Sequence, residues 1–325
     1  MEPVGTHIVV LNYNGRELLA ECLPSIALAA ARAPVSCPIT VLDNGSTDDS
    51  LAYLAENWPA VRVVSEPNAG LASFNTLLGR LTERTVLLLN NDVKLASDAI
   101  QPLLDELYAN PDALFAAPLC WDFAGEACEG MRTKVGMRYG LIRGLCRFPG
   151  HESGLDSPDL TASAGPVLAV DRLKFLALGG YDRIYFPGRI EDLDLGFRGW
   201  MAGWTGRYVP GSVAYHRGFG SFGPAFGVGG CDRLAMRNSL LFAWKNLGLK
   251  RLAGHLAWLP ARLTYATVRG QTTPWLALAG ALRRLPAAVR GRRALGVGKA
   301  GWSAREDAFF ERFDWTKDAP TTRAA

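Results

Sequence analysis

The residues best suited to chemistry in this sequence are amides and carboxylates that directly follow apolar runs. Residues 86–89 are four apolar residues, and Asn90, Asn91 and Asp92 come next. An unbroken apolar run is typical of a strand buried on both faces of a parallel sheet. Ligands of open α/β sheets bind at the carboxyl ends of such strands, so Asp92 is a candidate metal or ligand residue. A simple Asn-Asn-Asp turn would give the same pattern.

Three other predicted strands end in residues of the same kind. The residues that close them are Asn12 and Asn14, Asp43 with the polar segment that follows it to residue 50, and Asn68 and Gly70. Turn chemistry explains any one of these clusters. Because parallel strands end at one edge of a sheet, four clusters together predict a pocket for a polar ligand. Asp43 could accept hydrogen bonds from a base or ribose there, since an ionised carboxylate only accepts.

A second group of acidic residues consists of Glu191, Asp192 and Asp194. Apolar residues follow at helical spacing, so the three acids fall in the first turn of a predicted helix. Acids in that turn complement the helix dipole, which would be a structural role. The same position favours an ionised carboxylate, which could act as a base or a ligand. His216 is predicted to end a short strand and to open a glycine-rich segment, 218–230, where a mobile lid would be hinged.

Alternating strands and helices must position these residues. The expected strands are 7–12, 39–43, 62–65, 86–90, 113–117, 162–171, 208–210 and 213–216, and the expected helices are 16–31, 50–56, 72–81, 98–109 and 172–178. This alternation predicts an α/β fold with a mostly parallel sheet flanked by helices. Residues 119–160 break the pattern and predict an irregular insertion, either a flap over the pocket or a plain surface loop.

Composition narrows the class of protein. Hydrophobic residues make up 49% of the chain and charged residues 20%, as in a globular protein. The six cysteines form no CxxC pair and there are only four histidines, which disfavours a structural zinc site. We find no signal segment and no apolar stretch long enough for a transmembrane helix. We therefore expect free thiols and a reducing, cytoplasmic setting.

The C-terminal part of the chain is strongly basic. Residues 233–305 contain 14 Lys and Arg and no acidic residue. Predicted helices at 234–247, 250–269 and 275–285 combine apolar, aromatic and cationic residues, which is typical of a helix lying in a membrane interface. A plain helical subdomain is the alternative, and no nucleic-acid motif supports a third partner. We divide the chain into residues 1–247 and a basic amphipathic helical region, 248–325.

Taken in order, these motifs resemble the family 2 glycosyltransferases with a GT-A fold, in particular bacterial rhamnosyltransferase-like members. The resemblance covers residues 7–247. The segments that carry it are Asn12-Tyr-Asn14, Asp43-Asn-Gly-Ser-Thr-Asp48, Asn68-Ala-Gly70, Asn90-Asn-Asp92, Gly179-Gly-Tyr-Asp182, Glu191-Asp-Leu-Asp194 and His216.

Position by position, the resemblance implies a role for each motif. The donor-binding residues would be Asn12, Asn14, Asp43, Asn68, Gly70, Asn90 and Asn91. Asp92 lies in the family's DxD position and would hold Mg²⁺ or Mn²⁺ with His216. This sequence departs from the pattern at Asn90, where many members have Asp, and so offers one anionic oxygen fewer. Asp192 matches the catalytic base, and Glu191 and Trp121 would contact the acceptor.

The reaction that follows is an inverting sugar transfer from a nucleotide-diphosphate donor to a hydroxyl group. The resemblance suggests a rhamnose-like donor, a saccharide or polyprenyl-linked acceptor, and a role in cell-surface polysaccharide synthesis. Arg233 and Arg237 could steady the donor diphosphate or simply form an exposed basic helix face. The basic region would attach the protein peripherally to the anionic inner face of the cell membrane. The alternative is a catalytically silent sugar-nucleotide-binding or scaffold protein of the same fold.

Overall fold

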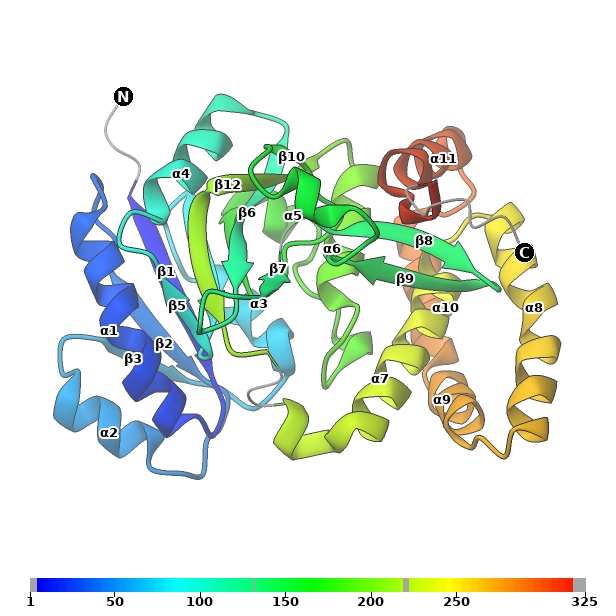
Figure 1. Ribbon diagram of the computed structural model, residues 1–325, viewed down its shortest axis with the longest axis horizontal. Coiled ribbons are helices and arrows are strands. Elements are labelled where there is room, and N and C mark those ends of the chain that lie inside the picture. The colour runs from blue at the N-terminus through cyan, green and yellow to red at the C-terminus, as the bar shows by residue number, and fades with distance from the viewer. Residues whose placement is uncertain (1–4, 131, 219–221, 318–325) are drawn as a thin grey trace.

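The computed structural model describes residues 5–130, 132–218 and 222–317 (Figure 1). Its centre is a ten-stranded mixed sheet, and eight strands follow the order β10-β12-β6-β11-β4-β1-β2-β3. The strands on the N-terminal side are β1 (Thr6–Asn12), β2 (Ile39–Asp43), β3 (Arg62–Ser65) and β4 (Thr85–Asn90). The helices between them are α1 (Arg16–Arg32), α2 (Ser50–Asn57) and α3 (Ser73–Leu78), with a 3-10 turn at Gly70–Ala72.

This half of the sheet is parallel, as the sequence predicts. Strand β1 lies between β4 and β2, and Asn12 pairs in register with Asp43 while Leu11 pairs with Asn90. Strand β3 continues the sheet, with Asp43 opposite Ser65. The polar clusters that end these four strands therefore do lie along one edge. Buried apolar residues of α1 and α4 (Ile100–Ala109) cover one face of the sheet, and those of α3 and α5 (Arg172–Ala177) cover the other.

The other half of the sheet brings distant segments to the same edge. Strand β11 (Val167–Asp171) is antiparallel to both β4 and β6 (Ala113–Trp121), and β12 (Thr205–His216) is parallel to β6. We expected two short strands before His216, but they form one long strand with a register shift between Val209 and Val213. The short strand β5 (Val93–Leu95), which the sequence did not predict, pairs with the end of β12.

In its described residues, 119–130 and 132–160, the insertion contains regular elements, which the expectation of an irregular segment did not include. Its elements are β7 (Cys128–Gly130), β8 (Lys134–Arg138), β9 (Leu141–Leu145), a 3-10 turn (His151–Gly154) and β10 (Asp159–Leu160). Strands β8 and β9 form a hairpin that projects towards the C-terminal helices (Figure 1). Its turn residues, Tyr139 and Gly140, both have positive φ, as in the two-residue turns that match strand twist.

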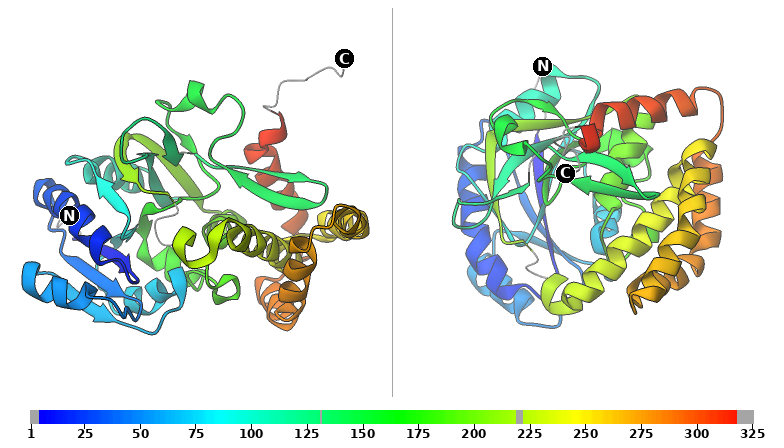
Figure 2. Two further views of the ribbon diagram at one scale, coloured as in Figure 1. Left: turned by 60° about the horizontal axis from the view of Figure 1, so that its bottom comes forward. Right: turned by 45° about the vertical axis from the view of Figure 1, so that its right-hand side comes forward.

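Five helices follow the sheet and lie together at one end of the molecule (Figures 1 and 2). They are α7 (Phe222–Asn246), α8 (Leu249–Val268), α9 (Thr273–Leu282), α10 (Leu285–Leu295) and α11 (Trp302–Phe313), followed by a 3-10 turn at Trp315–Lys317. From Phe222 onward, the predicted glycine-rich lid is helical and is broken only at Gly227, where φ is +63°. Residues 219–221 of that lid lie outside the described residues. No helix in the described part of the chain is long and apolar enough to cross a membrane.

These helices share a core with the sheet domain. Phe197 of α6 (Glu191–Met201) packs edge-on against Phe242 of α7 and Phe309 of α11, with ring centroids 5.3 and 5.0 Å away. Val135 and Ile142 of the hairpin are buried in the same cluster. The boundary that we placed at residue 247 thus falls inside a continuous core, and the division into two domains stays a prediction.

Candidate active site

A cleft of about 1250 Å³ opens at the carboxyl edge of the parallel strands. The insertion, the first turn of α6 and the start of α7 complete its walls. Eight of the predicted site residues line it: Asn68, Gly70, Asn90, Asn91, Asp92, Glu191, Asp192 and His216. Segments more than 120 positions apart in the sequence thus meet around one space that is large enough for a sugar nucleotide.

Asp92 and His216 face each other on one side of the cleft. Strand pairing places His216 opposite Val93, and the Arg217 amide donates to the Asp92 carbonyl at 3.1 Å. The His216 Nε2 lies 3.5 Å from Asp92 Oδ2, and neither Asp92 Oδ1 nor His216 Nδ1 has a hydrogen-bond partner in the described chain. Both side chains are largely buried, so these free atoms suit a ligand that reaches them through the cleft.

This pair fits a divalent cation. The described residues contain no group of three His, Cys, Asp or Glu side chains that could hold a metal alone. A cation such as Mg²⁺ is usually held by one or two protein carboxylates together with substrate phosphates, and two protein ligands beside an open cleft match that arrangement. The orphaned Asp92 oxygen is the observation on which this fit rests.

Asp43 and Asn12 lie behind the cleft and do not line it. Both are buried, and Asp43 accepts hydrogen bonds from Asn12, from the amides of Gly45 and Ser46 and from the Ser46 hydroxyl. The Asn12 side-chain oxygen accepts from Asn91 at 2.8 Å. These contacts fix the turn after β2 against Asn91, so they shape the wall that a donor would touch.

Asn14 is exposed and also holds this turn. Its φ is +46°, and its side-chain oxygen accepts from the Thr47 amide at 2.7 Å. Asn44, which lies in the polar segment after β2 but was not a predicted site residue, lines the cleft. Its amide nitrogen donates to the Gly70 carbonyl, and its buried oxygen has no partner among the described residues. Asn44 therefore offers the cleft a free acceptor, whereas the oxygens of Asp43 are already hydrogen-bonded.

Asp192 opens onto the cleft from the first turn of α6. Its Oδ2 accepts from the Ser163 hydroxyl at 2.8 Å, and its Oδ1 accepts from the Leu193 amide at 2.8 Å. Each oxygen thus has one partner and can accept a further hydrogen bond, since a carboxylate has about four acceptor positions. Ser163 also lines the cleft and is buried, and no motif in the sequence pointed to it.

Glu191 differs from its neighbour because it is almost fully buried. Burial and the adjacent Asp192 charge raise its pKa to about 8, so the expectation of an ionised carboxylate at this helix start was wrong for Glu191. Its Oε2 has no partner among the described residues. The two residues before the helix, Arg189 and Ile190, both have positive φ, a strained backbone that turns the first carboxylates of α6 into the cleft.

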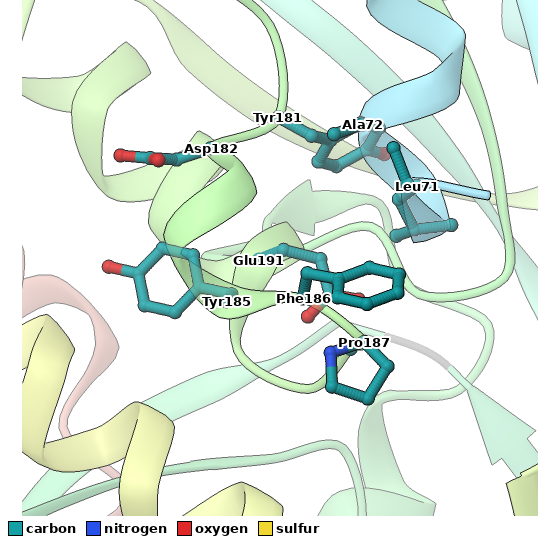
Figure 3. Close-up of a pocket in the computed structure, with 10 residues that line it drawn as sticks. Leu71, Ala72, Tyr181, Asp182, Tyr185, Phe186, Pro187 and Glu191 are labelled. Carbon is teal, nitrogen blue, oxygen red and sulfur yellow. The ribbon is translucent and has the colours of Figure 1, made fainter. Parts of the chain in front are cut away.

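A second, small cavity lies beside Glu191 (Figure 3). Leu71, Tyr185, Phe186 and Pro187 are among the residues that surround it, and the last two also line the large cleft. Its volume of about 10 Å³ is at the lower limit for one water molecule, which excludes it as a substrate pocket.

Asp194, the third acid of the group, is structural. It is fully buried, and its two oxygens accept from Tyr185, Arg198, Lys245 and Asn246. The Arg198 and Lys245 charges hold the pKa of the Asp194 carboxyl well below its usual range, despite burial. The structural role predicted for acids in this first turn therefore applies to Asp194. Its carboxylate belongs to a buried ion network that links α6 to α7.

Besides Asn12, Asn14 and Asp43, three further predicted residues are not part of the cleft lining: Trp121, Arg233 and Arg237. Trp121 pairs with Cys128 and Tyr215 at the end of β6 and packs under the insertion. Arg237 donates instead to the carbonyls of Tyr185 and Phe186. Asn238 donates to the carbonyls of Tyr185, Gly188 and Arg189, so α7 holds the loop that leads into α6.

Comparison with known proteins agrees with this geometry. A family model described as "Glycosyl transferase family 2" matches residues 7–126. The chain is also 30% identical over 242 residues to an N-acetylglucosaminyl-diphospho-decaprenol L-rhamnosyltransferase of Mycobacterium tuberculosis. The aligned region covers 64% of this chain and 75% of that protein. The chain belongs to glycosyl transferase family 2. Membership makes it a glycosyltransferase, and the family resemblance inferred from the motifs is confirmed.

Solved structures show the same fold. A mannosyltransferase from Pyrobaculum calidifontis, in complex with GDP-Man and Mn²⁺, aligns with a TM-score of 0.51 and 18% identity over 94% of this chain and 85% of that one. The S. aureus TarS fragment 1–349 in complex with UDP-GlcNAc aligns with a TM-score of 0.54 and 13% identity over 94% and 89%. The family 2 chain therefore has the GT-A fold that its motifs suggested.

Proposed function

We propose that this glycosyltransferase moves a sugar, with inversion, from a nucleotide-diphosphate donor to a hydroxyl of a saccharide or lipid-linked saccharide. The observation that carries the proposal is the shared cleft. Asp92 and Asp192, a hundred positions apart, open onto it from different elements, and each retains an oxygen that can accept a further bond.

In this proposal Asp192 is the base. The hydrogen bonds from Ser163 and from the Leu193 amide fix its orientation. It accepts the proton of the acceptor hydroxyl while that oxygen attacks the anomeric carbon of the donor. One base and one in-line displacement give inversion. Holding both substrates in the cleft converts the encounter into an intramolecular step and supplies much of the acceleration.

The turn after β2 and the segment after β3 bind the donor. Asn44 presents a free carbonyl oxygen, and Asn68 and Gly70 lie beside it in the cleft wall. Gly70 has φ of +61°, and a β-carbon there would lie 2.9 Å from the Pro187 carbonyl oxygen. Only glycine fits this close approach between the donor wall and the loop before α6.

Asp92 and His216 would hold Mg²⁺ or Mn²⁺, with Asn90 and Asn91 next to the donor phosphates. Such a cation neutralises charge on the departing diphosphate as a Lewis acid. Asn90 contributes an amide in place of a carboxylate, so the protein supplies only one formal negative charge at this position. Asn91 keeps its place through its bond to Asn12.

Ligand-induced stabilisation tests the donor site. Thermal unfolding should be measured with a panel of nucleotide sugars, with and without Mn²⁺, because a ligand that binds only the native state raises the melting temperature. We expect one class of donor to stabilise the wild type in a metal-dependent way, and a dTDP-linked rhamnose-like sugar is our first choice. The Asp92→Asn variant should lose the metal-dependent part. Equal stabilisation of that variant, or stabilisation by no nucleotide sugar, would contradict the assignment.

A lipid-linked acceptor in polysaccharide synthesis is proposed from similarity to the mycobacterial relative, whose name includes a diphospho-decaprenol acceptor. The exposed surface of the C-terminal helices supports a membrane location. Of 19 exposed large hydrophobic side chains in the described chain, nine lie between residues 249 and 285. They include Trp258, Tyr265 and Trp275, and they occur where the sequence has no acid. We propose that this surface rests on the anionic inner face of the membrane.

Vesicle flotation tests this surface. The wild type should float with anionic vesicles and bind neutral vesicles less, because both the cations and the aromatic residues contribute. Changing Trp258 and Trp275 to Ser should release the protein, whereas Leu28→Ser on α1, which removes an equally exposed residue from a different part of the molecule, should not. If the wild type does not bind either kind of vesicle and is dimeric in solution, the surface is a self-association face instead.

A further inference from the structure

Three arginines meet beside the loop that leads into α6: Arg233 and Arg237 of α7, and Arg284 between α9 and α10. We call them the arginine cluster. Arg237 and Arg284 both donate to the Phe186 carbonyl oxygen, at 2.8 and 2.7 Å. The distance between Arg237 Nη2 and Arg284 Nη1 therefore cannot exceed the sum of these two hydrogen-bond lengths. Arg233 lies one helical turn before Arg237, on the same side of α7.

The described chain gives this cluster no direct ion pair. Residues 233–305 contain no acid, although Asp232 directly precedes Arg233. Burial and the charges of Arg284 and Arg233 lower the pKa of Arg237 to about 10. Because like charges disfavour one another, an anion bound beside the cluster would relieve their repulsion.

The cluster also has unused hydrogen-bond donors. Arg237 uses Nε and Nη2, and Arg284 uses Nη1, for bonds to Asn238 and to backbone carbonyls. The other guanidinium nitrogens, Nη1 of Arg237 and Nε and Nη2 of Arg284, have no partner within the described chain. Planar guanidinium groups that present pairs of N–H donors match phosphate oxygens well.

Its position links the cleft to the apolar surface of the C-terminal helices. Phe186, whose carbonyl the arginines share, lines the cleft together with Pro187. On the other side, the exposed side chains of Leu282 and Leu285 flank Arg284 and continue the apolar surface of α9. An amphiphile with its sugar in the cleft and its chain on that surface would place its linking group at the cluster.

We propose that the arginine cluster binds the diphosphate that joins the acceptor sugar to its lipid. This inference rests on the proposed function, in which the acceptor is lipid-linked. It also assigns Arg233 and Arg237 to the acceptor and not to the donor, whose diphosphate lies at Asn90, Asn91 and Asp92. Recognition then depends on the diphosphate as well as on the sugar.

The test uses two soluble acceptors that carry the same sugar on the same short isoprenoid chain, one through a diphosphate and one through a neutral ether. Steady-state transfer is measured for the wild type, Arg284→Gln, Arg233→Gln and the control Arg283→Gln, whose side chain is exposed and next to Arg284. We expect KM for the diphosphate acceptor to rise about tenfold or more in the first two variants. The KM values for the ether acceptor and for the donor should not change, and Arg283→Gln should resemble the wild type.

Arg284→Gln also removes bonds to the loop, so Arg233→Gln is included because the structure gives its side chain no hydrogen bond to the described chain. An equal loss with both acceptors means that the cluster only supports the loop, and the inference is wrong. A raised donor KM with unchanged acceptor KM assigns the cluster to the donor and also overturns it. If the wild type uses both acceptors equally well, the diphosphate site is refuted while sugar transfer stands. Transfer to neither acceptor would refute both proposals.

Discussion

Asp192 and Asp194 are two residues apart on α6, yet one carboxylate lines an open cleft and the other lies in a buried ion network. The Asp194 carboxylate lies in a buried network in which Tyr185, Arg198, Lys245 and Asn246 satisfy both of its oxygens. The Asp192 carboxylate lies in the cleft with a single partner on each oxygen. Helical rotation separates them, since two residues correspond to about 200° around the axis.

The contrast extends beyond this helix. In the cleft, Asp92, Asn44 and Glu191 each have a buried oxygen without a partner. A buried polar atom that lacks a partner costs about 1–3 kcal/mol. A network that satisfies its carboxylate stabilises the fold, whereas a cleft that leaves several acceptors free is suited to a ligand that completes them. Four predictions test this distinction or make it more precise.

The largest effect is expected for Asp192→Asn. The amide keeps the shape of the side chain but cannot take a proton, so kcat should fall by about 10²–10⁴-fold. Thermal stabilisation by the donor should be retained, because Asp192 is assigned to the acceptor side. Asp105→Asn, an exposed change on α4, is the control. A wild type that binds donor but never transfers or hydrolyses it would favour the silent scaffold.

Asp194→Asn should affect stability rather than the chemical step. It leaves the buried Arg198 and Lys245 charges without a full counter-charge, which should lower the free energy of unfolding by about 3–5 kcal/mol. Denaturant unfolding measures this loss. Asp182→Asn is the matched control, because Asp182 pairs with the same Lys245 at 2.6 Å but is partly exposed, and its effect should be smaller. Equal losses would mean that burial of the network does not matter.

Glu191→Gln should change how stability depends on pH. The pKa of Glu191 is raised from 4.5 to about 8 in the folded state, so the unfolded chain releases this proton first as pH rises. Wild-type stability therefore falls between about pH 4.5 and pH 8, by about 1.4 kcal/mol for each unit of pKa difference that is realised. The variant lacks this fall, so its stability compared with that of the wild type should be higher at pH 8 than at pH 5.

Unfolding curves at several pH values check this prediction. Glu17→Gln, on the exposed side of α1, should leave the pH dependence of the wild type unchanged. If Glu191→Gln also leaves it unchanged, the Glu191 carboxyl is not held in its protonated form, and the distinction between Glu191 and Asp192 would be lost.

The smallest effect is expected for Ser163→Ala. It removes the hydroxyl that orients Asp192 Oδ2, and loss of one such hydrogen bond should reduce kcat by a few-fold to about tenfold. Pre-steady-state transfer measures it, with Thr161→Ser, which keeps a hydroxyl on the same segment, as the control. A loss as large as that of Asp192→Asn would indicate that Ser163 itself takes part in the proton transfer.

Much of the sheet could be predicted from the sequence. Apolar runs bounded by turn residues identified β1, β2, β3 and β4, and the resulting prediction of a shared polar edge is confirmed by their parallel register. The insertion was harder because strands β8 and β9 bury few residues each against α6, α7 and α11, and half-buried short strands have weak periodicity. The bounds of α10 and α11 were not predicted individually, although residues 248–325 as a whole were expected to be helical.

The candidate site was predictable where chemistry and strand ends coincide. The acids and amides at the ends of β1, β2 and β4 were found from their types and positions, whereas Asp192 and His216 were assigned roles through the resemblance to family 2 glycosyltransferases. Asn44 and Ser163 were not, because their importance lies in which neighbours they have and not in their residue type. The distance between Arg237 and Arg284 likewise depends on how α7 and α9 pack.

The sequence by itself determined the order of elements and the stock of polar groups, because local periodicity and turn propensity are properties of neighbouring residues. Tertiary structure alone decided which of those groups are already satisfied. Whether a carboxylate is neutral like Glu191, ion-paired like Asp194 or open to the cleft like Asp192 depends on burial and on partners from distant segments. Those partners are brought together only by the packing of the sheet and the C-terminal helices.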